Sequence, residues 1–133
     1  MKKLIISSDG CSRGNPGKAG IGYLIFDEHG HLVSRGSKPI GVRTNNEAEY
    51  IAAIEALKEA LRLGASEVEL FSDSELLVKQ VRGNYAVRSG RLKPLYEELL
   101  KLSRMLRRFE VKHIKRSANL GADRLARLAL NEY

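Results

Sequence analysis

The sequence predicts an α/β fold in which one mixed β-sheet is covered by helices. Three strand-like segments open the chain, and a glycine-containing turn joins the second to the third as a hairpin. Helical and strand-like segments then alternate, which is typical of parallel strands connected by helices. Ligands of such sheets bind beyond the carboxyl ends of the parallel strands, so a site is expected there.

The five predicted strands are short apolar segments bounded by turns or helices. In the turn from Asp27 to Gly30, the glycine can adopt the positive φ that a tight hairpin requires. The strands are expected at Lys3–Ser8, Ala19–Asp27, His31–Ile40, Glu67–Ser72 and Phe109–Ile114.

Four predicted helices complete the order β-β-β-α-β-α-α-β-α. The longest begins with a capping box formed by Thr44 and Glu47, and it stops before Gly64. The helices are expected at Thr44–Leu63, at Ser74–Arg82, from Leu92 to about Arg107, and at Gly121–Asn131.

The chain is basic, since 23 Lys and Arg residues against 16 Asp and Glu residues give a formal net charge of +7. This charge favours a polyanionic partner, either nucleic acid or an anionic membrane, with general solubility as the alternative explanation. No apolar segment approaches the roughly 20 residues that span a bilayer. The apolar run near the N-terminus stops at Ile6, too early for a signal peptide. We therefore expect no membrane partner.

The length of 133 residues suits a single domain over residues 1–133. Cys11 is the only cysteine, so an internal disulfide is impossible and a reducing, cytoplasmic location is expected. Nothing in the sequence indicates an obligate protein partner, and a monomer is expected.

Four carboxylates stand at the ends of predicted elements. Asp9 follows the first strand and opens a glycine-rich loop, and Asp73 follows the fourth strand in the same way. Taken alone, Asp9 could form an ordinary Asp-Gly turn, and Asp73 could be a capping acid beside Ser74. Asp123 lies in the first turn of the last helix, where an acid usually compensates the helix dipole.

Glu49 carries a stronger signal, because it heads an apolar stripe of the longest helix that should face the sheet. A carboxylate on that face is costly unless a partner such as a metal ion compensates its charge. The alternative is a first-turn glutamate stabilised by the helix dipole. The stripe consists of Ala53, Ala56, Leu57, Ala60 and Leu61.

The combination of the four acids predicts a metal site at one edge of the sheet. Carboxylates this close cannot all ionise without cations, and sites made only of oxygen ligands select Mg²⁺ or Mn²⁺. An acidic metal pocket on a basic protein suits the cleavage of a phosphodiester.

Four segments, in order, resemble the signature segments of type 1 ribonuclease H: Asp9–Gly17, Thr44–Glu49, Ser72–Ser74 and Ala118–Asp123. The resemblance implies a ribonuclease H-like fold, with a mixed five-stranded sheet whose first three strands are antiparallel and whose others are parallel. It implies hydrolysis of the RNA strand of an RNA–DNA hybrid, leaving 5′-phosphate and 3′-hydroxyl ends. Two Mg²⁺ ions, or Mn²⁺, would be held by the catalytic acids Asp9, Glu49, Asp73 and Asp123.

The resemblance also implies contacts to the hybrid. The backbone from Gly10 to Ser12 would touch 2′-hydroxyls or bases in the minor groove together with Asn15 and Asn46, and Thr44 with Asn15 would grip a DNA phosphate. Asn119 could touch the substrate or shape its loop. The full expected set is Gly10, Cys11, Ser12, Asn15, Thr44, Asn45, Asn46, Ser74 and Asn119.

Three features depart from the family pattern. Glu75 stands where many relatives have Gln, and the loop 115–119 lacks the histidine of some bacterial relatives. His113 is nearby, but it is expected within the last strand. The segment between Gly83 and Leu92 is too short for the basic protrusion of some relatives. Contacts to the DNA strand must then come from Tyr85, Arg88, Arg91 and Lys93, or be weaker.

Other functions remain open on the sequence. A nuclease of the same broad fold could act on duplex RNA or duplex DNA with the same acids. A non-catalytic nucleic-acid-binding module is disfavoured because all four acids are present. A fragment of a reverse transcriptase is a further alternative, against which the initial methionine favours a free-standing enzyme.

Overall fold

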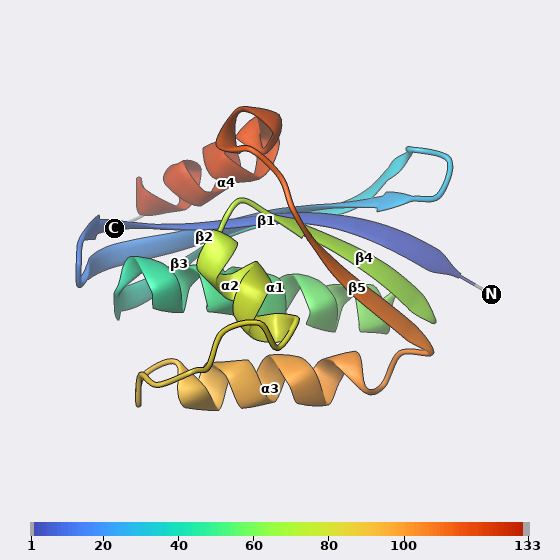
Figure 1. The fold of residues 1–133 in the computed structure, drawn as a ribbon. Coiled ribbons are helices and arrows are strands. Elements are labelled where there is room, and N and C mark those ends of the chain that lie inside the picture. The colour runs from blue at the N-terminus through green and yellow to red at the C-terminus, as the bar shows by residue number, and fades with distance from the viewer. Residues whose placement is uncertain (1, 132–133) are drawn as a thin grey trace.

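The computed structural model describes residues 2–131, in which one sheet is enclosed by helices on both faces (Figure 1). The strands lie in the order β3-β2-β1-β4-β5. Pairing is antiparallel from β1 to β3 and parallel between β1, β4 and β5, which confirms the predicted mixed sheet. The strands are β1 (Lys3–Gly14), β2 (Gly17–Asp27), β3 (Leu32–Arg43), β4 (Glu67–Ser72) and β5 (Arg108–His113).

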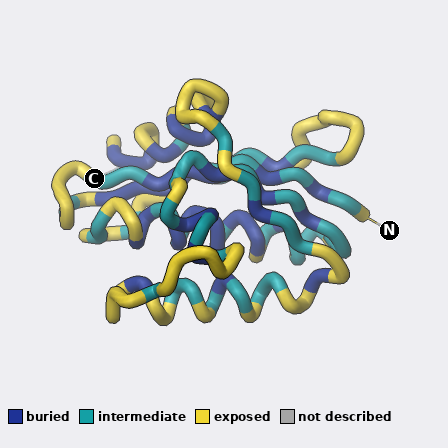
Figure 2. Tube along the Cα trace, viewed as in Figure 1, coloured by how far each residue is buried: buried dark blue, intermediate teal, exposed yellow. Residues whose placement is uncertain are grey.

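The helices divide between the two faces of the sheet. Figure 1 shows α4 alone on one face, α1 and α2 on the other, and α3 beyond α1. The buried chain runs through the middle strands and the sheet-facing side of α1 (Figure 2). The helices are α1 (Asn45–Arg62), α2 (Glu75–Val81), α3 (Lys93–Ser103) and α4 (Leu120–Leu130), and a short 3₁₀ turn, η1 (Arg116–Ala118), precedes α4.

Helix α1 forms as the pattern predicts. The side chain of Thr44 accepts the N–H of Glu47 at 3.1 Å, and Glu47 Oε1 accepts the N–H of Thr44 at 2.9 Å, which confirms the capping box. The apolar stripe is buried against the sheet, with Ala53, Ala56, Leu57 and Ala60 fully inaccessible. Small alanines at these positions let the helix lie close to β1, on the face from which Glu49 must reach the site.

The first strand is longer than predicted. The expected loop after Ser8 is instead a continuation of β1, which pairs with β2 as far as Gly14 opposite Gly17. Pairing with β4 stops at Ser8 opposite Ser72, so Asp9 lies where β1 loses its parallel neighbour and continues beside β2 alone. The sequence did not predict this extension because the segment is rich in glycine, and glycine is depleted in ordinary strands.

The third helix is shorter than predicted and stops at Ser103 rather than near Arg107. The N–H of Arg107 donates to Ser66 O at 2.8 Å, which turns the chain into β5 beside β4. This tertiary contact overrides the helical pattern of the sequence. Across residues 2–131, every helix is too short or too polar to cross a membrane.

Candidate active site

Three of the four predicted acids meet at one edge of the sheet. One ligand oxygen each from Asp9, Glu49 and Asp73 lies within 4.8 Å of the others. Asp9 and Asp73 follow the last parallel pair of β1 and β4, Ser8 and Ser72, so the two strands deliver them side by side. Helix α1 supplies Glu49 from the face that it covers.

Glu49 can reach this position because residue 10 is a glycine and has no side chain. Glu49 Oε1 accepts the backbone N–H of Gly10 at 2.8 Å. A Cβ at Gly10 would overlap the backbone of Ala48, so only glycine lets α1 approach β1 this closely. The hydrogen bond therefore fixes the carboxylate of Glu49 against the strand that carries Asp9.

Asn119 holds Asp73 in place. Its Nδ2 donates to Asp73 Oδ2 at 3.2 Å and to Ser8 O at 2.9 Å, which joins the loop before α4 to the ends of β4 and β1. The residue is only 2% exposed. Asn119 was expected either to touch the substrate or to shape its loop. These two hydrogen bonds correspond to the second role, because they tie the loop to the strand ends.

Asp123 lies beside the three-acid group rather than within it. Arg127 Nε lies 3.2 Å from Asp123 Oδ2, and Arg116 Nη2 lies 4.0 Å from Asp123 Oδ1. Burial is the largest cause of the raised pKa of Asp9, and the Asp123 side chain adds to it. Sequence reasoning missed these two arginines, although the spacing of Asp123 and Arg127 by four residues is a readable helix ion pair.

A second glycine brings α4 to the site. Gly22 pairs with Asp9 across β1 and β2, and a Cβ there would overlap Ala122 O and press within 2.5 Å of Ala126 N. Close packing of α4 on β2 at this point places Asp123 next to Asp9. The sequence offered no periodic signal for this contact.

The electrostatics of the cluster favour cations. Burial, followed by the charge of Asp73, raises the pKa of Asp9 to about 7. Burial, followed by the charges of Asp9 and Asp73, raises the pKa of Glu49 well above its usual value. Asp9 Oδ2 is buried without a hydrogen-bond partner among the described residues. Clustered oxygens, one of them unpaired, fit hard divalent ions such as Mg²⁺.

The raised pKa of Asp9 predicts a pH-dependent stability. Between about pH 4, where an aspartate ordinarily titrates, and about pH 7, the native carboxyl keeps a proton that the unfolded chain has released. The free energy of unfolding should therefore fall as pH rises through this window and level off above it. Thermal melts in a chelator should show that the melting temperature of an Asp9→Asn variant rises relative to that of wild type as the pH increases. If the melting temperatures of the two proteins change in parallel with pH, the raised pKa of Asp9 is contradicted.

The residues predicted to contact the substrate flank the acids. Asn15 Oδ1 accepts the N–H of Asn45 at 3.0 Å, which joins the turn between β1 and β2 to the start of α1. Asn46 is exposed beside them. The hydroxyls of Thr44 and Ser74 accept backbone N–H groups as the caps of α1 and α2.

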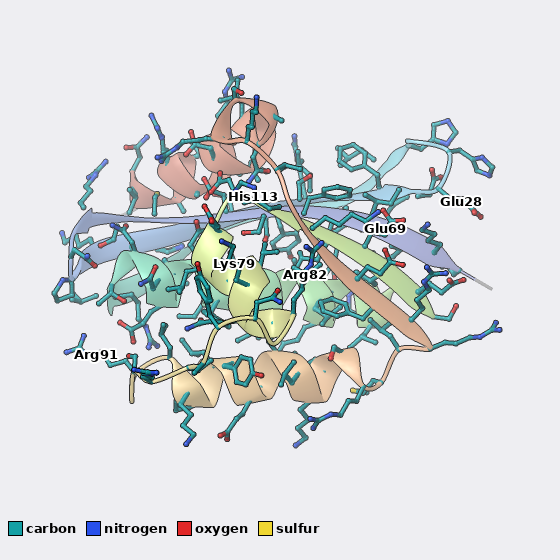
Figure 3. All side chains as sticks on the ribbon, in the orientation of Figure 1. Glu28, Glu69, Lys79, Arg82, Arg91 and His113 are labelled. Atoms are coloured by element: carbon teal, nitrogen blue, oxygen red, sulfur yellow. The ribbon has the colours of Figure 1, made fainter. Side chains whose placement is uncertain are left out.

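His113 and Glu75, both weighed against the family pattern in the sequence, lie near the acids. His113 ends β5 opposite Ser72, one residue before Asp73, and its side chain is exposed (Figure 3). Within residues 2–131, it contributes no atom to the three-acid group. The neighbouring Glu75 pairs with Lys79 at 2.6 Å, which lowers the pKa of that carboxyl and keeps it ionised.

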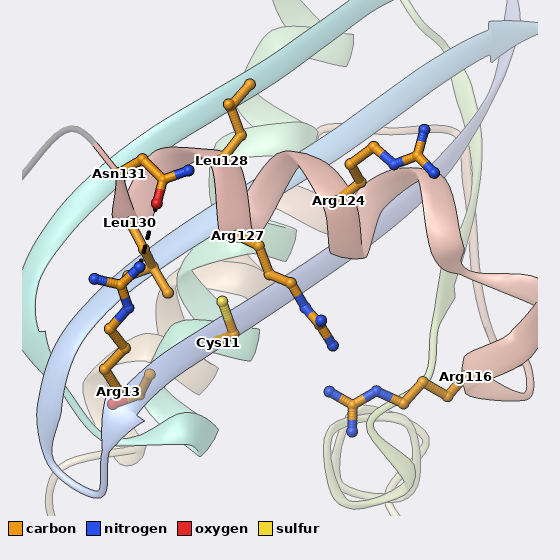
Figure 4. Close-up of a pocket in the computed structure, with 9 residues that line it drawn as sticks. Cys11, Arg13, Arg116, Arg124, Arg127, Leu128, Leu130 and Asn131 are labelled. Atoms are coloured by element: carbon orange, nitrogen blue, oxygen red, sulfur yellow. Dashed lines mark hydrogen bonds between the residues drawn. The ribbon is translucent and has the colours of Figure 1, made fainter.

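Beside Asp123 lies an open pocket of about 560 Å³ (Figure 4). It includes the half-buried Cys11 and Ser12, two of the predicted substrate contacts. The remaining lining comes from η1, α4 and its C-terminal end, and β1: Arg13, Arg116, Arg124, Arg127, Leu128, Leu130 and Asn131.

Comparison with known proteins finds ribonucleases H among the relatives of this chain. Residues 7–129 match the family described as reverse transcriptase-like. A ribonuclease HI of Halobacterium salinarum is 37% identical over 124 residues, which cover 93% of this chain and 62% of the relative. A bifunctional protein of Mycobacterium tuberculosis is 38% identical over 130 residues, which cover 97% of this chain but 36% of the relative. The chain therefore spans between about a third and two thirds of these curated relatives.

Two solved structures share the fold over nearly the whole chain. The crystal structure of RNase H1 from Halobacterium salinarum has a TM-score of 0.96 at 35% identity, covering 98% of this chain and 99% of that one. LC11-RNase H1, isolated from compost and crystallised in complex with an RNA/DNA hybrid, has a TM-score of 0.92 at 39% identity, covering 97% of both chains.

Proposed function

The chain belongs to the type 1 ribonuclease H family, and we propose that it hydrolyses the RNA strand of RNA–DNA hybrids. It acts as an endoribonuclease and leaves 5′-phosphate and 3′-hydroxyl ends. The observation that carries the proposal is the meeting of Asp9, Glu49 and Asp73 within 4.8 Å at the edge of a sheet in a protein of net charge +7. The hybrid bound to LC11-RNase H1 supports the choice of substrate.

We assign Asp9, Glu49, Asp73 and Asp123 as the ligands of two divalent ions, Mg²⁺ or Mn²⁺. When bound, such ions supply an activated water and a counter-charge for the departing oxygen. All four side chains are carboxylates, and each comes from a different strand, strand end or helix.

The surrounding residues hold these ligands in a fixed geometry. The N–H of Gly10 orients Glu49, and the amide of Asn119 orients Asp73. Arg127 and Arg116 form ion pairs with the carboxylate of Asp123. Preorganised ligands of this kind need no rearrangement during the reaction.

Binding and strand choice have different origins in this proposal. The positive charge of the protein attracts any polyanion and contributes no preference for RNA. The backbone of residues 10–12, with Asn15 and Asn46, reads 2′-hydroxyls of the RNA strand, and Thr44 with Asn15 binds a phosphate of the DNA strand.

The protein works as a monomer in the cytoplasm.

A substrate panel tests this function. With Mg²⁺ present, a hybrid should be cleaved in its RNA strand, whereas duplex DNA should stay intact because it lacks the 2′-hydroxyls. In hybrids with riboses replaced singly by deoxyriboses, only a few positions flanking the cut should matter. Equal cleavage of hybrid and duplex DNA would refute hybrid specificity, and cleavage of duplex RNA alone would favour another nuclease of this fold.

A further inference from the structure

The pocket beside Asp123 gathers more positive charge than its neighbouring carboxylate balances. Arginines from β1, η1 and α4 line it, and the lining described within residues 2–131 includes no carboxylate: the four are Arg13, Arg116, Arg124 and Arg127. Figure 4 shows Cys11 between them, with the ends of Arg127 and Arg116 turned toward each other. Like charges held this close favour an anionic occupant.

Only part of this charge is balanced within the protein. Arg127 and Arg116 share the single carboxylate of Asp123. Among residues 2–131, the partner of the Arg13 guanidinium is a neutral group, Asn131 Oδ1, at 3.3 Å. No hydrogen bond or ion pair joins the side chain of Arg124 to another described residue. Within the part of the chain that the structure describes, the charges of Arg13 and Arg124 are therefore not balanced by a carboxylate.

We propose that this pocket binds the sugar–phosphate backbone of the strand that is cut, at a distance from the scissile phosphate. The inference rests on the proposed function, because it takes the acid cluster as the point of cleavage. Arg116 and Arg127 contact Asp123 from the pocket side, so the pocket and the acid cluster are contiguous. A strand whose phosphate lies at the acids enters the pocket next.

The length of β1 sets the reach of the subsite. Asp9 and Arg13 are four residues apart on one strand, which corresponds to about 13 Å at roughly 3.3 Å per residue. A nucleic-acid strand advances about 3.4 Å per nucleotide along its axis, and its winding makes each step between phosphates longer than that, so Arg13 meets the backbone within about four nucleotides of the cut. Leu128 and Leu130 give the pocket an apolar wall suited to the faces of sugars.

The test uses Arg13→Gln and Arg124→Gln, with Arg104→Gln as the matched control. Arg104 is exposed at the end of α3, which lies on the other side of the sheet from α4. Binding of a hybrid is measured by fluorescence anisotropy in a chelator, over a series of salt concentrations. Each pocket variant should bind roughly three- to tenfold more weakly at low salt, and its salt slope should drop by about 0.9 for each phosphate that the protein no longer neutralises. The control should change little.

Shortened strands identify what occupies the pocket. The RNA strand or the DNA strand is trimmed from either end around a short ribonucleotide tract that fixes the cut. In the wild-type protein, trimming the RNA strand to fewer than about four nucleotides on one side of the cut should weaken binding to the level of the pocket variants. In the pocket variants, the same trimming should not weaken binding further, because the contact is already lost. The same result from trimming the DNA strand would overturn the assignment, as would equally weakened binding in the pocket and control variants. Because binding is measured without divalent metal, failure of this subsite is distinguishable from failure of cleavage.

Discussion

The Asp9→Asn variant should lose cleavage of an RNA–DNA hybrid by several orders of magnitude while keeping the native fold. An amide preserves the shape of the side chain but cannot offer a second anionic oxygen to divalent cations. Asp9 is 2% exposed and interacts with Glu49, Asp73 and Asp123, so its carboxylate lies among the other three acids. Hybrid cleavage is measured at saturating Mg²⁺.

Two measurements separate a catalytic role from a structural one. The far-ultraviolet circular dichroism of Asp9→Asn should match wild type, and its melting temperature in a chelator at neutral pH should be equal or higher, because a repulsive buried charge is removed. Glu97→Gln makes the matching change of carboxylate to amide on an exposed position of α3 and should leave cleavage unaffected. Turnover by Asp9→Asn close to that of Glu97→Gln would overturn the site assignment.

Gly22→Ala should reduce both stability and cleavage, although Gly22 lies outside the acid cluster. A Cβ at this position overlaps the backbone of α4 at Ala122, so the helix must move away from β2. Overpacking of this kind costs about 1–3 kcal/mol in the free energy of unfolding. The same movement withdraws Asp123 from Asp9, and a misplacement of about 1 Å can cost about 100-fold in rate.

Gly90→Ala is the matched control, because no atom lies within 4 Å of a Cβ built there. Urea denaturation and hybrid cleavage should be nearly unchanged in this variant. In Gly22→Ala, the loss of activity should persist at temperatures where the protein is fully folded, since it arises from displaced geometry. Activity that returns to the wild-type level under those conditions would show that Gly22 matters for stability alone.

Much of the architecture could be predicted from the amino-acid sequence, because the relevant signals are local. The capping box of Thr44 and Glu47, the apolar stripe after Glu49, and the short apolar segments between turns depend on neighbours within a few residues. The approximate places of Asp9, Glu49 and Asp73 followed from those elements. Their meeting at one edge followed from the rule that parallel strands share a carboxyl end.

The contacts that turn these acids into a site could be seen only in the folded chain. Helix α1 approaches β1 at Gly10, and α4 approaches β2 at Gly22. Both approaches depend on atoms far apart in the sequence, and both glycines lie within strands, where no local sequence pattern indicates a close contact. The arginines around Asp123 gather from separate elements, so their charges add only after folding. Periodicity reports which face of an element is buried; how closely two faces approach is set by the atoms that meet there.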